Sequence, residues 1–397
     1  MKRFGRLAHL ALALPTLALA AAIAPARADF ASCVSGLRSH ALGQGISGAT
    51  FDRMMSGVTP DMKIIEAMNA QPEFRTPIWD YLATLVDDQK IAEGRAMLAR
   101  HASVLARIEQ AYGVDRHTVV AVWGVESDFG QVPGRWSLPQ ALSTAACFGT
   151  RRREFFRTEL VSTMKIVQRG DLDAEKLRGS WAGAFGHTQF IPSTYLRLAV
   201  DFDGDGRRDL VDSIPDALAS TANYLKKSGW ITGASWGYEV RLPAGYAGPS
   251  GRTGKQDLGS WSGRGITRID GSALSGLPAA GLLLPAGRNG PAFLVTKNFD
   301  AAYAYNAAES YALAISILSD RLRGRPGIRT PWPTDDRGLS RAERKELQER
   351  LTRAGYDVGK PDGAIGALTR AAIKDVEAKL GMPQTGRAGG KVFDSLR

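Results

Sequence analysis

The sequence predicts a mainly α-helical protein with a small β-rich insertion and a separate helical module at its C-terminus. From Phe30 to about Leu225, apolar residues recur at spacings of three and four, as in MKIIEAMNA and FRTELVSTMKIV, which is typical of amphipathic helices. Residues 233–291 are instead rich in Gly, Ser, Pro and Trp with short apolar runs, which favours strands and turns. After an aperiodic segment, residues 339–397 again carry short helical patterns.

Residues 1–28 have the composition of a secretory signal peptide. Lys2, Arg3 and Arg6 precede an Ala- and Leu-rich stretch, which ends in the small-residue processing site Ala-Arg-Ala. A membrane anchor is the alternative, but Pro15 lies inside the stretch and no Cys immediately follows the site to accept a lipid. We therefore expect cleavage, export to the periplasm and no transmembrane anchor in the mature chain.

The chain is basic, with 51 Lys and Arg against 40 Asp and Glu and a formal net charge of +11. Removal of residues 1–28 would take away four basic residues and leave +7. An exported basic protein suits an anionic polymer such as nucleic acid, an acidic polysaccharide or the cell wall, although a solvated basic surface explains the charge as well. Its two cysteines, Cys33 and Cys147, would pair in an oxidising compartment, with two free buried thiols as the alternative.

An acidic side chain ends an apolar helical stripe in the run VVAVWGVESDFG. Val122 and Trp123 lie four and three residues before Glu126 and therefore share its helix face. Burial there would disfavour the charged carboxylate and keep Glu126 protonated near neutral pH, as a general acid requires. Asp128 falls on the opposite side of the helix, and no second carboxylate is evident, whereas ordinary glycosidases use a pair. A helix-terminal Glu held by a backbone group or an Arg is the structural alternative.

Three runs, VWGVESDFG, GSWAGAFGHTQFIPSTY and NFDAAYAYNAAESYALAI, occur in an order and spacing that resemble the soluble form of the lytic murein transglycosylase B family, glycoside hydrolase family 103. The resemblance spans residues 29–322. It implies a lysozyme-like helical catalytic domain, a β-rich insertion at residues 233–291 and a deep groove in which peptidoglycan is cleaved.

The resemblance also implies roles for individual residues. Glu126 would be the sole acid and base. The residues expected to contact the substrate are Ser180, Gln189, Phe190, Tyr224, Tyr305, Asn306 and Tyr311, with Arg151 and Arg152 facing the acidic stem peptide. Taken by themselves, the tyrosines also fit core positions and the arginines a solvated basic turn. The family commonly has Ser two residues after the Asn, whereas this chain has Ala308.

A lone acid implies a particular reaction. Protonated Glu126 would donate to the oxygen that links N-acetylmuramic acid to N-acetylglucosamine. The resulting carboxylate would then deprotonate the C6 hydroxyl of the same muramic ring, which attacks C1 and leaves a 1,6-anhydro sugar. A hydrolytic muramidase would share almost every residue, and a non-catalytic wall-binding scaffold is the third interpretation.

The run DFDGDGRRDLVD, residues 201–212, fits the ligand spacing of an EF-hand calcium loop. The expected ligands are Asp201, Asp203, Asp205, the carbonyl of Arg207, Asp209 and Asp212. Asp replaces the usual Glu at position twelve and has a shorter reach, so we expect a structural Ca²⁺ of modest affinity. The alternative is an acidic turn that Arg207 and Arg208 hold without a metal.

Residues 323–338 combine Pro, Gly and charge without periodicity and are predicted to form a linker. Residues 339–397 resemble the three-helix peptidoglycan-binding domain through LQERLTRAGYDVG, PDGAIGALTRAAI and LGMPQTG. Its expected core consists of Leu347, Leu351, Ile365, Ile373 and Val376. The module would hold the enzyme on the wall as a tether, with a bare helical cap as the alternative.

The expected partners are therefore peptidoglycan glycan strands and their stem peptides. We expect no nucleic acid and no organic cofactor, and we expect the protein to be a monomer.

Overall fold

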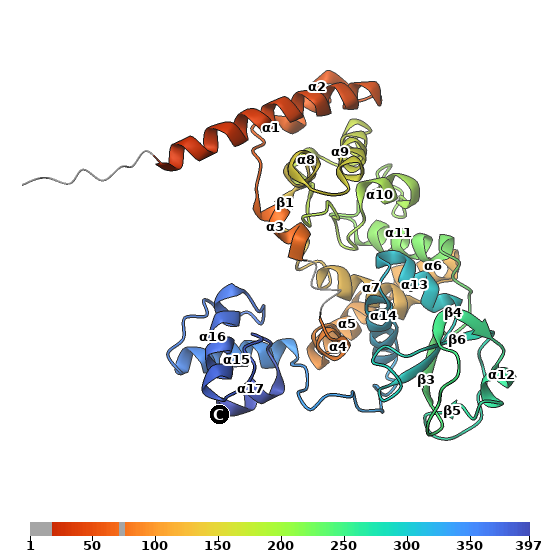
Figure 1. The fold of residues 1–397 in the computed structure, drawn as a ribbon. Coiled ribbons are helices and arrows are strands. Elements are labelled where there is room, and N and C mark those ends of the chain that lie inside the picture. Colours follow the sequence, from red (N-terminus) through yellow and green to blue (C-terminus); the bar gives the residue numbers. More distant parts are fainter. Residues whose placement is uncertain (1–17, 71–75) are drawn as a thin grey trace, which may run out of the picture.

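The computed structural model describes residues 18–70 and 76–397, and it confirms the mainly helical fold (Figure 1). The main body, which ends at Leu322, consists of helices joined by short loops, with one inserted sheet. Its helices are α1 (Ala18–Gly43), α2 (Gly48–Met55), α3 (Lys63–Ala70), α4 (Ile78–Leu85), α5 (Asp88–Arg100), α6 (Ala102–Tyr112), α7 (Arg116–Ser127), α8 (Leu138–Phe148), α9 (Arg153–Gln168), α10 (Pro192–Leu198), α11 (Ile214–Lys227), α12 (Leu258–Ser262), α13 (Lys297–Asn306) and α14 (Glu309–Leu322).

Two clusters of buried side chains form the core of the helical part of the main body, and a third lies within the inserted sheet. The first surrounds α7, which packs against α14 and α5, and includes fully buried Val119, Val122 and Trp123. The second surrounds α8 and α9, which pack against each other and against α1, α2, α3 and α10. The apolar stripe before Glu126 is therefore core, as its periodicity predicts.

The N-terminal helix is tied to the second cluster by a disulfide. Cys33 of α1 and Cys147 of α8 are bonded, with Cα atoms 5.9 Å apart, and the predicted pairing is confirmed. Helix α1 runs from Ala18 to Gly43 and so continues through the expected processing site; residues 1–17 of the predicted signal peptide lie outside the described residues. In the part of the chain that the structure describes, no helix has the length and apolar character needed to cross a membrane.

The insertion forms an antiparallel five-stranded sheet, visible beside α12 in Figure 1. Its strands are β3 (Gly237–Arg241), β4 (Gly251–Gln256), β5 (Thr267–Arg268), β6 (Ala280–Leu283) and β7 (Ala292–Val295), in the spatial order β4-β6-β7-β3-β5. The sheet passes the expected end at Pro291, because its middle strand is the wholly buried run AFLV that follows. A second, two-stranded ribbon pairs β1 (Trp136–Ser137) with β2 (Arg178–Gly179).

The C-terminal module has the three predicted helices, α15 (Arg341–Arg353), α16 (Ala367–Lys379) and α17 (Gly390–Ser395). Ser340 and Glu343 form a reciprocal capping box that fixes the start of α15. Of the expected core residues, Leu347, Leu351, Ile373 and Val376 are buried, whereas Ile365 is only partly buried.

The linker, residues 323–338, has no helix or strand, as predicted, but it is held against its neighbours. The backbone N–H groups of Arg329 and Thr330 each donate to the Glu239 carboxylate at 2.8 Å. Gly338 pairs with Gly389 of the module, and a Cβ at Gly338 would lie only 2.9 Å from the Trp79 carbonyl oxygen of α4. The predicted linker is thus held against both the main body and the module, and we call it the strap.

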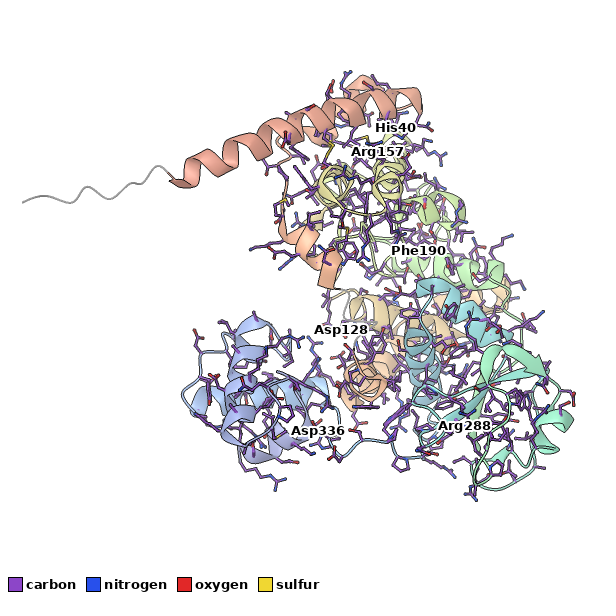
Figure 2. All side chains as sticks on the ribbon, in the orientation of Figure 1. His40, Asp128, Arg157, Phe190, Arg288 and Asp336 are labelled. Atoms are coloured by element: carbon purple, nitrogen blue, oxygen red, sulfur yellow. A yellow bond between two sulfur atoms is a disulfide. The ribbon has the colours of Figure 1, made fainter. Side chains whose placement is uncertain are left out.

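Ion pairs dock the module on the main body. The Arg387 guanidinium makes a bidentate bond to the Asp80 carboxylate of α4, with Nε donating at 2.6 Å and Nη2 at 2.7 Å. Arg341 pairs through its guanidinium with Asp128, which Figure 2 labels, and its backbone N–H donates to Asp87 at 3.2 Å. We call Asp80, Asp87 and Asp128, with Arg341 and Arg387, the docking interface.

Replacement of Cys33 and Cys147 by Ser should lower the free energy of unfolding by about 4 kcal/mol, because the bond closes a sequence separation of 114 residues. Urea unfolding of the oxidised chain checks this. A reducing agent should destabilise the natural chain to the same extent and leave the double variant unchanged. An equal urea midpoint for both oxidised chains would contradict the prediction.

Candidate active site

Glu126 lies in the last turn of α7 and lines a groove of about 1160 Å³. The groove has walls from both the main body and the C-terminal module. Its main-body lining includes Asp80, Tyr81, Val125, Glu126, Arg152, Phe155, Phe156, Ser180, Trp181, Gln189, Tyr305, Asn306 and Tyr311. Its module lining is Leu339, Arg344, Ile365, Arg370, Thr385, Arg387 and Ala388.

The surroundings of Glu126 favour its protonated form. Burial raises the pKa of Glu126 to about 8, and a hydrogen bond from the Tyr311 hydroxyl to Oε1 opposes that shift. Burial also raises the pKa of Tyr311 well above its usual range, so Tyr311 remains a donor. The Tyr305 ring stacks on Tyr311 at 6.2 Å between centroids. The raised pKa keeps Glu126 protonated at neutral pH, and its role as a proton donor stays a prediction.

The turn that follows Glu126 is held in an unusual backbone conformation. Asp128 and Phe129 have φ values of 53° and 57°, a left-handed region that is costly for residues other than glycine. The Asp128 carboxylate is ion-paired with Lys90 and Arg341, and Lys90 also donates to the Gly124 carbonyl at 2.9 Å. Burial raises the pKa of Asp128, but its bonds to Lys90 and Arg341 outweigh burial and give a net lowering. Asp128 is thus a paired anion that stabilises the helix end, not a second catalytic carboxylate.

Six of the nine side chains expected to contact substrate line the groove: Ser180, Gln189, Tyr305, Asn306, Tyr311 and Arg152. Gln189 has a φ of 51°, and its amide nitrogen donates to the carbonyls of Pro133 and Gly186 at 3.0 and 2.9 Å. Asn306 ends α13, and Ala308 is the N-cap residue before α14. Because its side chain cannot accept a hydrogen bond, the helix start has no side-chain cap, at the position where the family commonly has Ser.

The other three do not belong to the lining. Phe190, labelled in Figure 2, is only 2% exposed, and its ring packs at 5.9 Å against both Tyr224 and Tyr305. The Tyr224 hydroxyl donates to the Ala304 carbonyl at 2.6 Å. Arg151 reaches the Met68 carbonyl at 3.4 Å. Phe190 and Tyr224 therefore pack against Tyr305 outside the groove lining and do not face the groove.

Sequence reasoning missed three groups of lining residues, one of which comes from α4 and includes Asp80 and Tyr81. Phe155, Phe156 and Trp181 add an aromatic surface, and the last of these is the Trp of the GSWAG run already singled out, so it could have been found. The module residues could not, because nothing in the sequence places residues 339–397 beside Glu126.

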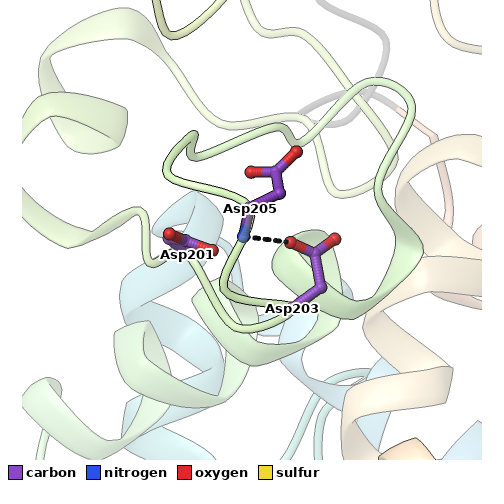
Figure 3. Close-up of side chains that lie close together, drawn as sticks. All are labelled: Asp201, Asp203 and Asp205. Atoms are coloured by element: carbon purple, nitrogen blue, oxygen red, sulfur yellow. Dashed lines mark hydrogen bonds between the residues drawn. The ribbon is translucent and has the colours of Figure 1, made fainter.

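Three of the predicted metal ligands converge. One carboxylate oxygen from each of Asp201, Asp203 and Asp205 lies within 4.8 Å of the others, on the exposed loop in Figure 3. Arg207 instead donates to the Gly170 carbonyl at 3.2 Å, and Arg208 pairs with Asp171. The arginines therefore do not neutralise the three carboxylates.

The remaining two acidic positions of the loop are used differently. The Asp209 carboxylate accepts the backbone N–H groups of Val211 and Asp212 at 2.8 Å each, and Asp212 pairs with Lys176. The loop is anchored by Asp216, which sequence reasoning missed. Fully buried, Asp216 accepts backbone N–H groups from three loop residues, Phe202, Asp203 and Asp209.

Comparison with known families agrees with this architecture. The model of the transglycosylase SLT domain matches residues 29–320, and that of the peptidoglycan binding domain matches residues 340–396. The chain belongs to the transglycosylase SLT domain family. Membrane-bound lytic murein transglycosylase B of Escherichia coli K12 is 33% identical over 203 residues, which cover 48% of this chain and 56% of the relative. The match thus spans little more than half of that relative's length.

Solved structures from two bacteria resemble most of the chain. SltB3 from Pseudomonas aeruginosa, in complexes with NAG-NAM-pentapeptide and with NAG-anhNAM-pentapeptide, is 46% identical, with a TM-score of 0.75 over 93% of this chain and 99% of that one. The Escherichia coli lytic transglycosylase Slt35 in complex with calcium is 28% identical, with a TM-score of 0.65 over 73% of this chain and 92% of that one.

The Glu126–Tyr311 contact predicts a pH dependence. Because Glu126 must carry a proton to act as an acid, kcat/KM should fall as pH rises through about 8. In Tyr311→Phe the bond that lowers the pKa of Glu126 is lost, so the alkaline limb should move to higher pH while the maximum falls about tenfold. Turnover of purified glycan strands across pH 5–10, with Tyr112→Phe as the control, measures both effects. A shift to lower pH would contradict this assignment.

Proposed function

We propose that the protein is a peptidoglycan lytic transglycosylase with Glu126 as its single acid and base. The decisive observation is how the two carboxylates of the groove are paired. Among the described lining residues only Glu126 and Asp80 are acidic, and Asp80 is bound by Arg387. The groove thus offers one free, protonated acid, whereas hydrolysis by the usual two-carboxylate mechanisms needs a second.

The proposed reaction uses Glu126 twice. Its carboxyl donates a proton to the glycosidic oxygen between N-acetylmuramic acid and N-acetylglucosamine as the C1–O bond breaks, and the substrate's N-acetyl group stabilises the cation. The Glu126 carboxylate then accepts the proton of the C6 hydroxyl, whose oxygen bonds to C1 and closes a 1,6-anhydro ring. No water is consumed, and Glu126 ends as it began. The anhydro sugar in the complex of the similar SltB3 supports this outcome.

The tyrosine cluster would prepare Glu126 for both steps. Tyr311 donates to Oε1 and can stabilise the carboxylate that forms after the first step. Tyr305, whose hydroxyl donates to the Thr188 carbonyl at 2.7 Å, holds the Tyr311 ring from one side. The proton therefore returns to a carboxylate that has stayed in place.

We further propose export to the periplasm with loss of residues 1–28, and action as a monomer on glycan strands. The Cys33–Cys147 disulfide supports an oxidising compartment. Cleavage after Ala28 would leave the helix α1 residues that carry Cys33 intact.

We also propose that Asp201, Asp203 and Asp205 bind a structural Ca²⁺ with the Arg207 carbonyl. Converging, exposed carboxylates without a cationic partner are the donor set that Ca²⁺ prefers. The calcium complex of the similar Slt35 supports this assignment. Bound to the loop that leads into α11, the ion would relieve the repulsion among the three charges.

Glu126→Gln should abolish the release of sugars from purified sacculi while binding to sacculi persists, because the amide cannot donate the proton and then accept another. Mass spectrometry of the natural enzyme's products should find anhydro ends, one water lighter than reducing ends. The exposed Glu175→Gln is the matched control and should retain activity. Reducing ends would favour a hydrolytic muramidase, and undiminished release by Glu126→Gln would refute the assignment.

Asp203→Asn should lower the melting temperature in the presence of Ca²⁺ and have little effect once the ion is chelated. The amide keeps the shape of the side chain but weakens its attraction for the cation. The matched control is Asp88→Asn, since the Asp88 side chain is fully exposed on α5. Equal losses with and without Ca²⁺ would indicate a loop that binds no ion.

A further inference from the structure

The groove contains a partly buried cationic side chain whose Nε atom is buried and has no hydrogen-bond partner. Arg344 projects from α15 into the groove lining, and its Nε atom is buried without a hydrogen-bond partner. Within the described residues its guanidinium makes no hydrogen bond and no ion pair. Buried polar groups are almost always paired, and an unpaired guanidinium is costly, so the position calls for a ligand.

The nearby docking interface does not supply that ligand. Asp80 is held by Arg387, and Asp87 accepts the backbone N–H of Arg341. Burial lowers the pKa of Arg344, and Asp87 and Asp80 oppose this from a distance without touching the guanidinium. These acids favour a charged Arg344 but leave its N–H groups free.

Other free cations face the same groove. Arg370 of α16 lines it, is exposed and makes no side-chain bond among the described residues. Arg152 lines the main-body wall, where its guanidinium stacks 4.1 Å from the centre of the Phe155 ring. An anionic group that enters the groove beside Glu126 therefore meets arginines from both walls.

We propose that Arg344, assisted by Arg370, binds a carboxylate of the peptide branches of the glycan, so that the C-terminal module takes part in substrate selection within the catalytic groove. A planar guanidinium with two outward N–H groups matches a carboxylate in a bidentate bond. The neutral sugar backbone offers no such partner, whereas each peptide branch carries carboxylates.

This proposal rests on the proposed function, because it takes the groove to be the glycan site. It differs from the anticipated tether, in which the module binds the wall away from the cut. Here the same helix that docks on the main body through Arg341 presents Arg344 to the substrate. Recognition by the module and proton transfer by Glu126 then occur on one stretch of glycan.

The test compares two substrates: glycan strands with their peptides and strands from which an amidase has removed them. Arg344→Gln should lower kcat/KM about tenfold more on peptide-bearing than on peptide-free strands, through KM, because one charge-assisted bond is lost. Arg344→Lys, which keeps the charge but not the fork, should recover part of the loss. Arg353→Gln on the exposed side of the same helix is the matched control.

A binding measurement separates this proposal from the proposed function. Free stem peptide should bind the Glu126→Gln protein about tenfold more tightly than the Glu126→Gln, Arg344→Gln protein, as measured by calorimetry. If the natural chain cleaves no glycan but this difference holds, the enzymatic assignment fails and the peptide site stands. Equal losses on both substrates, or equal peptide affinities in folded proteins, would overturn the proposal.

Discussion

The carboxylate of Asp128 is the point on which the active site and the arrangement of the two domains both depend. It accepts Lys90 from α5 on one side and Arg341 from the C-terminal module on the other. These ion pairs, with the Lys90 bond to the Gly124 carbonyl, hold two successive left-handed residues that would cost about 1 kcal/mol or more each. Glu126 lies just before this turn, in a helix end that would otherwise fray. The orientation of the Glu126 side chain toward the groove therefore depends on the contact between Asp128 and Arg341 of the module, which lies more than two hundred residues further along the sequence.

Two carboxylates in one helical turn thus have opposite ionisation states. Asp128 is buried between two cations and stays charged, whereas Glu126 is buried beside tyrosines and keeps its proton. The difference arises from the partners that each side chain finds, since burial by itself raises the pKa of both carboxyl groups. Tyr311 stabilises the Glu126 carboxylate only moderately, because it is a neutral hydrogen-bond donor. The carboxylate can therefore form during the reaction, but Glu126 stays protonated before it. A cation in its place would leave the site without an acid at neutral pH.

The sequence predicts the local features well. Helical periodicity, the buried stripe before Glu126, the disulfide and the three small helices depend on residues close in sequence or on composition, and the structure agrees with them. The long-range contacts are less predictable. Phe190 and Tyr224 are aromatic residues in the right motifs, yet they pack behind Tyr305, and one residue type fits both roles. The contacts of the strap could not be predicted, because a segment of Pro, Gly and charged residues without periodicity gives no indication that its backbone N–H groups bind Glu239.

Because the module is docked beside the groove, its binding to the wall affects glycan cleavage directly and not only through the local substrate concentration. A tethered module raises the concentration of substrate near an independent site, and its benefit falls as the linker lengthens. Here the strap fixes the distance, and the module supplies part of the groove wall itself. Docking is electrostatic, but the Asp128 end of the contact is only 9% exposed, so salt screens it less than an open surface pair. The module is therefore a component of the active site, and its affinity for the wall acts at the point where Glu126 transfers its proton.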